Sequence, residues 1–361
     1  MPRLTPPPKN GFELPGRPPA AASAPELRIS PLLPVPGLLL DAGIDPAPLL
    51  ASSGIAATAF AEAGTWVPYQ AGVRLLRHAA LATGREDFGL MVGERLDYAN
   101  LGLLAMLTQR APTVGEALQT LVRYFHLHDR GAVLYLRANG AGLVTLGYAA
   151  HDAAITGIAY AYDLAIRVAV TLLYALCGPN WRAREIRLPH SRPASPSAWK
   201  RSFGVPVVFN ASAAEVWFDA SWLGQPPPFA DLQAQHELLR SAQQIESELA
   251  LPLAERTRHL ARALAMTGTL SADNVADLLA LHSRTLRRRL AAEGTSFNTV
   301  AAAVRFDIAQ QLLRDTDMPL GDIADVLGYA DLTAFVRAFR GWAQCPPGQW
   351  REARKRPPIA P

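Results

Sequence analysis

Hydrophobic residues recur along this chain with two different periods, and the change of period divides the chain into regions. Residues 31–128 carry apolar residues at a spacing near 3.6, most clearly in Val73–Thr83 and Val114–His126, which predicts a mostly helical region. Strand signals follow at Ala132–Arg137 and Gly142–Ala149. The four residues between these strands (ANGA) predict a hairpin turn.

The next apolar run, Ile155–Cys177, predicts a long helix. Its length would suit a membrane span, but Asp163 and Arg167 lie inside it four residues apart, which favours a buried amphipathic helix. Three short strands and a helix with polar faces are predicted to follow, at Glu185–Leu188, Val205–Asn210, Glu215–Asp219 and Phe229–Leu249.

Only helical patterns remain after Pro252. We therefore expect an α+β N-terminal domain followed by an all-α C-terminal domain with helices near 254–267, 271–280, 283–291, 297–314, 320–327 and 331–342. The expected divisions are a disordered Pro/Ala-rich tail (1–30), a sensor domain (31–250), the helical domain (251–354) and a second disordered tail (355–361).

The helical domain contains an internal repeat. VADLL (Val275–Leu279) matches IADVL (Ile323–Leu327), and a second helix follows each copy after a short turn. Ser271 is suited to cap the first helix of the first copy, and Gly328 suits the left-handed turn of the second. Two helix–turn–helix units in tandem, joined by one long helix near 297–314, are therefore predicted.

The second helix of the first copy, SRTLRRRL (Ser283–Leu290), concentrates positive charge. Leu286 and Leu290 lie on one side of the helix and predict its buried face. The other side presents candidate DNA-contacting residues: Ser283, Arg284, Arg287, Arg288 and Arg289. Arginine can donate two parallel hydrogen bonds to guanine O6 and N7, or bind phosphates. The alternative is a solvated face charged for solubility, but such a face would normally mix charge signs.

The second copy presents a less basic surface. Phe335, Phe339 and Trp342 predict its buried side, and the candidate DNA contacts opposite them are Thr333, Val336, Arg337 and Arg340. We expect this unit to discriminate less between sequences than the first. An exposed face without DNA contact remains the alternative for this copy.

The distribution of charge agrees with a DNA-binding C-terminal part. The formal net charge is +4, and residues 251–361 hold 15 basic and 11 acidic residues, which accounts for all of it. A basic part joined to a neutral larger part suggests contact with a polyanion. The two cysteines, Cys177 and Cys345, form no disulfide framework, and the N-terminus lacks the apolar core of a signal peptide. A soluble cytoplasmic protein without a membrane partner is expected.

The C-terminal residues resemble the AraC/XylS family of bacterial transcription regulators. The resemblance covers about residues 254–354 and includes Val275–Phe297, Ile323–Trp342 and the closing CPPGQWR, where Pro347 and Trp350-Arg351 stand in a segment that usually reads Pro-x-x-Tyr-Arg. The resemblance implies base-reading positions at Arg284, Arg287, Arg288, Leu332, Thr333, Val336 and Arg337.

Residues 31–250 resemble the arabinose-binding-type sensor half of one branch of that family, through Gly89–Phe125 and Phe203–Asp219. This resemblance implies a small-molecule effector, a homodimer and RNA polymerase as partners, and activation more than repression. Effector binding is expected to bias the geometry or availability of the DNA-binding half.

Other chemistry has little support in the sequence. Aromatic and histidine residues that could line an effector pocket are Trp66, Tyr69, Tyr98, Tyr124, His126 and His128, with ordinary core packing as the alternative. The His126-x-His128 pair suggests no metal site by itself, and HExxH, GxSxG and GxxxxGK[ST] are absent from the chain. We expect no cofactor, no metal and no catalytic residues.

Three other functions have less support in the sequence. Some alkylation-repair proteins join a related DNA-binding module to a reactive cysteine and a four-cysteine zinc site, which two distant cysteines cannot build. Turnover of a small molecule by residues 31–250 has no nucleophile–base spacing behind it. An architectural DNA protein would need no large neutral domain.

Overall fold

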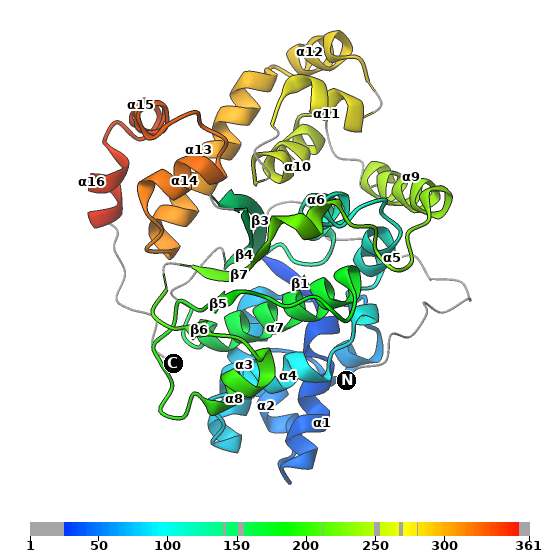
Figure 1. Cartoon of the computed structure of the whole chain (residues 1–361), viewed down its shortest axis with the longest axis vertical. Helices are drawn as coiled ribbons and strands as arrows, with labels where there is room; N and C mark the ends of the chain where they lie inside the picture. The colour runs from blue at the N-terminus through cyan, green and yellow to red at the C-terminus, as the bar shows by residue number, and fades with distance from the viewer. Residues whose placement is uncertain are drawn as a thin grey trace.

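The computed structural model describes residues 25–139, 142–150, 155–211, 213–248, 253–266, 270–279 and 281–353. The predicted α+β first part and all-helical second part are both confirmed. In Figure 1, the helices of residues 253–292 lie at one end of the longest axis, the helices of residues 34–53 lie at the other end, and the main sheet lies between them.

The main sheet has five strands in the order β3-β4-β7-β5-β6. Its strands are β3 (Ala132–Asn139), β4 (Leu143–Ala150), β5 (Glu185–Arg187), β6 (Val207–Val208) and β7 (Ala214–Asp219). The predicted hairpin is confirmed, because β3 pairs antiparallel with β4 in the register Leu134↔Tyr148. β3 continues to Asn139, two residues beyond the predicted end, and residues 140–141 of the expected turn lie outside the described residues.

Helices cover the sheet and build the rest of the first part. The α-helices are α1 (Pro34–Asp41), α2 (Pro46–Ser53), α3 (Tyr69–Thr83), α4 (Phe88–Arg95), α5 (Leu103–Gln109), α6 (Val114–Tyr124), α7 (Ile158–Cys177), α8 (Ser197–Phe203) and α9 (Leu232–Glu248). Short 3-10 helices join them: η1 (Ser30–Leu32), η2 (Ala57–Ala61), η3 (Tyr98–Leu101), η4 (Phe125–Leu127) and η5 (Ala220–Gly224).

Helix α7 is the long apolar helix of the first part. Among the described segments it alone is long and apolar enough to cross a membrane, yet 61% of its most apolar window is buried inside the protein. Asp163 does not pair with Arg167: its Oδ1 accepts hydrogen bonds from Trp199 Nε1 at 2.8 Å and His190 Nε2 at 3.1 Å. Arg167 instead donates to the Thr171 hydroxyl of the same helix at 2.9 Å.

Among the described residues, regular secondary structure begins at Glu26, within the tail that was expected to be disordered over residues 1–30. Glu26–Arg28 form β1, which pairs antiparallel with β2 (Trp66–Pro68), and Ser30 begins η1. Leu27 and Ile29 are buried, so their apolar side chains hold this segment on the first part. The expected tail is therefore wrong for residues 26–30, and residues 1–24 lie outside the described residues.

The second part consists of seven helices in its described residues. These are α10 (Leu253–Met266), α11 (Ala272–Leu278), α12 (Ser283–Ala292), α13 (Phe297–Asp315), α14 (Leu320–Val326), α15 (Leu332–Ala343) and α16 (Pro347–Glu352). The first six lie within one or two residues of their predicted bounds, and α11 is shorter than predicted at both ends. Helix α16 was not predicted, and its Trp350 is 5% exposed and packs edge-on against Phe339.

Candidate DNA interface and effector cavity

Helices α11 and α12 form the first helix–turn–helix unit around a small core of their own. Leu286 and Leu290 of α12 are fully buried, and they pack with Leu260, Val275 and Ala276 from α10 and α11. The hydroxyl of Ser271 accepts a hydrogen bond from the backbone N–H of Asn274 at 3.1 Å, so the predicted cap is confirmed. These contacts fix which face of α12 points away from the protein.

That outward face is rich in arginine, and its guanidinium groups form no ion pair with any residue that the structure describes. Arg284, Arg287, Arg288 and Arg289 are all exposed, and none forms an ion pair within the described residues. The nearest acid, Glu293, is used elsewhere, because its carboxylate accepts hydrogen bonds from the backbone N–H groups of 253 and 254 at 2.9 and 2.8 Å. The face therefore keeps its positive charge available for a polyanion.

Helices α14 and α15 form the second unit. Asp331 caps α15 by accepting from the Ala334 N–H at 2.7 Å, and Gly328 adopts the expected left-handed conformation with φ 71°. Phe335 and Phe339 are fully buried, as predicted, with their ring centroids 5.8 Å apart. Trp342 is only half-buried.

The outward residues of α15 follow the sequence prediction. Thr333, Arg337 and Arg340 are exposed, and Val336 is half-buried beside them. Leu332 is 43% exposed at the start of the helix, an unusual place for a leucine without a partner. Helix α13 joins the two units, and Ser296 caps it through the Thr299 N–H at 3.1 Å.

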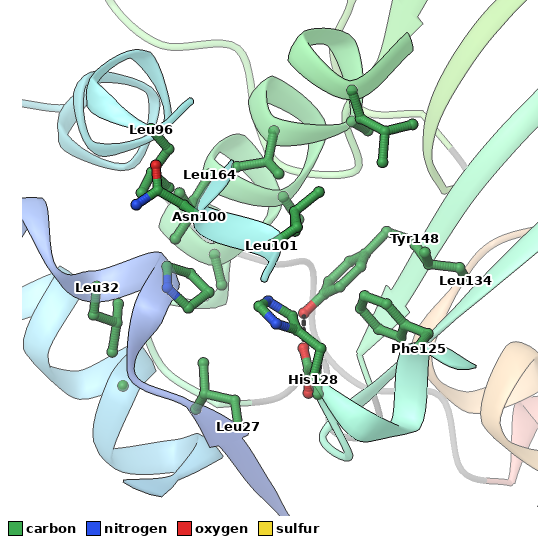
Figure 2. Close-up of a pocket in the computed structure, with 18 of the residues that line it drawn as sticks. Leu27, Leu32, Leu96, Asn100, Leu101, Phe125, His128, Leu134, Tyr148 and Leu164 are labelled. Atoms are coloured by element: carbon green, nitrogen blue, oxygen red, sulfur yellow. Dashed lines mark hydrogen bonds between the residues drawn. The ribbon is translucent and has the colours of Figure 1, made fainter. Parts of the chain in front are cut away.

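The first part encloses a cavity of about 100 Å³ between α7, α3 and the β3–β4 hairpin (Figure 2). Aliphatic side chains dominate its lining. They include Leu27, Leu32, Val73, Leu76, Leu96, Leu101, Leu121, Leu134, Leu146, Leu164, Val168 and Leu172. Such a lining with a few converging polar groups is typical of small-molecule sites.

One wall of the cavity is polar. The Tyr148 hydroxyl donates a hydrogen bond to Asp129 Oδ2 at 3.1 Å, and the hydroxyls of Tyr69 and Tyr148 lie 2.9 Å apart. The Gly131 N–H donates to Asp129 Oδ1 at 2.7 Å. Burial raises the pKa of Asp129 to about 7, although these donors act in the opposite direction.

His128 contributes a second polar group to the cavity. Its side chain is 6% exposed, and Figure 2 shows the ring directed into the space between Leu101 and Leu27. Neither ring nitrogen forms a hydrogen bond to any described residue. Burial and the nearby Arg28 charge lower its pKa to about 4, so the ring is neutral at pH 7.

Four of the six predicted pocket residues lie outside this lining, and only Tyr69 and His128 belong to it. Trp66 lies under the guanidinium groups of Arg28 and Arg130. Tyr98 is buried against the Thr108 hydroxyl, and Tyr124 is fully buried with the Arg123 guanidinium over its ring. His126 hydrogen-bonds the Arg123 carbonyl at 3.0 Å. Core packing, the alternative given for these side chains, accounts for the buried Tyr98 and Tyr124, whereas Trp66 and His126 are half-buried.

The opposite face of the β3–β4 hairpin contacts the helical part. Side chains alternate along a strand, so Leu134 faces the cavity while Arg137 of the same strand lies on the other face. Arg137 is 9% exposed and lies between two carboxylates, 3.7 Å from Glu215 of β7 and 3.3 Å from Asp322 of α14. This pair joins the sheet to the second helix–turn–helix unit.

Gln311 of α13 makes the second polar link between the two parts. It is 4% exposed, and its Nε2 donates to the carbonyls of Ala149 and Ala150 at 3.0 and 3.2 Å. Its Oε1 accepts from Arg262 of α10 at 2.8 Å. Figure 1 shows α13 and α14 beside β3 and β4. Strand β4 thus contacts the cavity through Tyr148 and the DNA-binding part through its next two residues.

Sequence reasoning missed Asp129, Tyr148 and Gln311. One signal was present, because the alternation in β4 places Val144, Leu146 and Tyr148 on one face of the strand. No comparable signal marks Gln311, whose partners on the strand lie more than 160 residues away. Within the described part of the chain, His, Cys, Asp and Glu side chains form no group of three that could hold a metal ion.

Comparisons with known proteins agree with this geometry. Residues 43–227 match the model of the arabinose-binding domain found at the N-terminus of the AraC transcription regulator, and residues 275–353 match a helix-turn-helix domain model. The HTH-type transcriptional regulator VirS of Mycobacterium tuberculosis is 29% identical over 317 residues, which cover 87% of this chain and 93% of VirS.

Two further similarities come from Pseudomonas aeruginosa. The ornithine utilization regulator is 28% identical over 297 residues, covering 78% of this chain and 83% of that protein. The crystal structure of the transcriptional regulator CdpR is 25% identical, covers 85% of this chain and 96% of CdpR, and has a TM-score of 0.43.

Proposed function

The chain belongs to the AraC family of helix-turn-helix transcription regulators, and we propose that it is an effector-responsive activator that reads two successive major-groove segments of its operator. DNA is its partner, and the family is one of regulators rather than enzymes. The two segments would lie about one helical turn apart, with α12 in one and α15 in the other.

The arginine face of α12 carries this proposal. Arg284, Arg287 and Arg288 are assigned to base edges, and Ser283 and Arg289 to the flanking phosphates. In α15, Thr333, Val336 and Arg337 are assigned to bases and Arg340 to phosphate. What supports the assignment is that the α12 arginines are exposed and unpaired among the described residues, and that α12 is anchored by two buried leucines.

The proposal also assigns roles to the domains. The first domain, beginning at β1 rather than at residue 31 and ending near 250, binds a small effector in the cavity beside α7 and helps to form a homodimer. Residues 251–354 bind DNA and, in an activator, bring RNA polymerase to the promoter. The burial of α7 within the first part supports a cytoplasmic protein without a membrane partner.

The position of the cavity supports coupling between effector and DNA. The hairpin β3–β4 lines the cavity on one face and contacts α13 and α14 on the other, so a ligand that shifts Tyr148 also moves the carbonyls that Gln311 binds. A ligand can shift the equilibrium between two arrangements only by its difference in affinity for them. Because the hairpin contacts both the cavity and the DNA-binding helices, a change in its position can give the ligand different affinities for the two arrangements.

Selection of duplexes from a random DNA pool by the full chain tests the proposed function. We expect one sequence to be enriched, with two fixed blocks whose centres lie about 10 base pairs apart. DNA binding without enrichment of any sequence would instead indicate an architectural protein that binds the backbone alone.

The link through Gln311 gives a testable prediction about coupling. A Gln311→Ala variant leaves two strand carbonyls and Arg262 without their amide partner, so we expect the free energy of unfolding to fall by about 1–3 kcal/mol. We also expect a cavity ligand to change operator affinity less in this variant than in the wild type. Urea unfolding and operator titrations with and without ligand measure the two effects.

Gln310 supplies a matched control, because it is the adjacent residue of the same helix and contacts no strand carbonyl in the described structure. The Gln310→Ala variant should keep both wild-type stability and wild-type coupling. If Gln311→Ala keeps full coupling, the hairpin is not the route between cavity and DNA.

A further inference from the structure

The chemistry of the cavity wall restricts the class of effector it can accept. We propose that the cavity binds a compact aliphatic alcohol or primary amine, whose head group donates a hydrogen bond, and that it rejects the carboxylate of the same length. This inference rests on the proposed effector role of the first domain.

The body of the ligand follows from the aliphatic lining and the size of the space. Leucine, valine and alanine side chains from α3, α7 and the hairpin surround most of the cavity. Its volume of about 100 Å³ is of the same order as the ~150 Å³ apolar cavity that takes up benzene. A chain of about six carbons suits such a space.

The charge of the wall excludes an anionic head group. No lysine or arginine belongs to the lining as the described residues form it, whereas two carboxylates do. Asp129 is buried, and Asp97 is exposed and caps η3 through the Asn100 N–H at 3.2 Å. A ligand carboxylate would lose its water shell here and gain no cation from the lining in return, so its binding is disfavoured.

The proton directions at the polar wall favour a donor. When Asp129 is ionised, the Tyr148 hydroxyl donates its proton to Asp129, so the hydrogen bond between Tyr69 and Tyr148 takes its proton from Tyr69. Both protons therefore point along the chain toward Asp129. The Asp129 carboxylate and the Tyr148 oxygen then face the cavity as acceptors, and an acceptor is best satisfied by a ligand O–H or N–H.

His128 completes the head-group site. A neutral imidazole has one donor and one acceptor nitrogen, and this one is 94% buried without a hydrogen-bond partner among the described residues. The ring lies in the cavity lining, so a ligand head group can form the hydrogen bonds that no described residue forms with it. A hydroxyl can accept from one nitrogen or donate to the other, and an amine can donate.

Three probes with one chain length test the inference: hexan-1-ol, hexylamine and hexanoate, each titrated into the full chain by calorimetry at pH 8, above the pKa of about 7 that burial gives Asp129. We expect the alcohol and the amine to bind and to raise the thermal unfolding midpoint, and hexanoate to bind at least tenfold more weakly. Equal or tighter binding of hexanoate overturns the proposal, and so does the absence of binding by all three probes.

Variants test where the head group binds. A variant that fails to fold would not affect the comparison of the three probes, because that comparison uses the wild-type chain. We expect His128→Phe to weaken hexan-1-ol binding about tenfold or more, and the matched His126→Phe variant, outside the lining, to leave it unchanged. We expect Asp129→Asn to reduce the difference in affinity between hexanoate and hexan-1-ol. Unchanged binding in His128→Phe would contradict the assignment of the head-group site.

Operator affinity measured in the same samples distinguishes a failure of the proposed ligand class from a failure of the proposed effector role. Failure of the probes to bind, in a chain that still selects its operator, overturns only the ligand class. Probe binding with no effect on operator affinity supports the ligand class and contradicts the effector role of the cavity.

Discussion

A double variant that replaces Arg284 and Arg288 by alanine is expected to bind its selected operator at least roughly thirtyfold more weakly than the wild type. Each arginine that donates two hydrogen bonds to a guanine contributes about 1–3 kcal/mol of discrimination, so two such losses amount to about 2–6 kcal/mol. Fluorescence anisotropy at one fixed salt concentration measures the loss, with random duplexes in parallel.

The specificity of that loss distinguishes base contacts from phosphate contacts. If both arginines meet base edges, affinity for random DNA should change far less than affinity for the operator. A matched control removes the same two charges from the first domain at the exposed Arg182 and Arg240, and it should bind the operator almost as the wild type does. An equal loss on both kinds of DNA would reassign Arg284 and Arg288 to the backbone.

The DNA-binding half could be predicted from sequence because its signals are local. Leu286 and Leu290 lie one helical turn apart, and this spacing alone determines that the intervening arginines point outward. The same holds for the caps, since Ser271 and Gly328 act on residues within four positions of themselves. Helix α16 escaped prediction because its six residues contain two turn-forming types and only one buried aromatic, Trp350.

The effector half could be predicted only in part because its site depends on distant pairings. The hairpin β3–β4 joins neighbouring segments and was predicted, but the order β4-β7-β5-β6 brings together strands separated by helices. Strand β1 has only three residues, and its sole strand partner among the described residues, β2, lies about 40 residues later in the sequence, so local patterns did not predict it. The polar wall combines Tyr69, Asp129 and Tyr148, and no sequence spacing marks these three as neighbours.

The buried carboxylate of Asp163 in α7 gives the second prediction, which concerns the free energy of unfolding. An Asp163→Ala variant is expected to lower the free energy of unfolding by roughly 3–5 kcal/mol, because it leaves His190 and Trp199 in the core without their shared acceptor. Asp163 and His190 are each 1% exposed, so water cannot replace the lost carboxylate. Chemical denaturation of the full chain, followed by tryptophan fluorescence and circular dichroism, measures the change.

The pH dependence of stability gives the same pair a signature that a packing defect would not have. Burial alone lowers the pKa of His190, but the Asp163 carboxylate and the Ser191 carbonyl outweigh it and raise the pKa above its usual 6.5. The folded state therefore holds a proton that the unfolded state releases. This contribution to stability is fully present below about pH 6.5 and is lost as the pH rises through the folded pKa of His190.

In Asp163→Ala the direction of this pH dependence should reverse, because burial without the carboxylate favours the neutral imidazole. The exposed pair Arg95–Asp41 is the matched control: its atoms lie 3.1 Å apart, the same separation as in His190–Asp163, but both side chains are about 60% exposed. Asp41→Ala should cost no more than about 1 kcal/mol, since water screens and replaces the interaction. Equal costs for the two variants would mean that burial does not determine the strength of the Asp163 interactions.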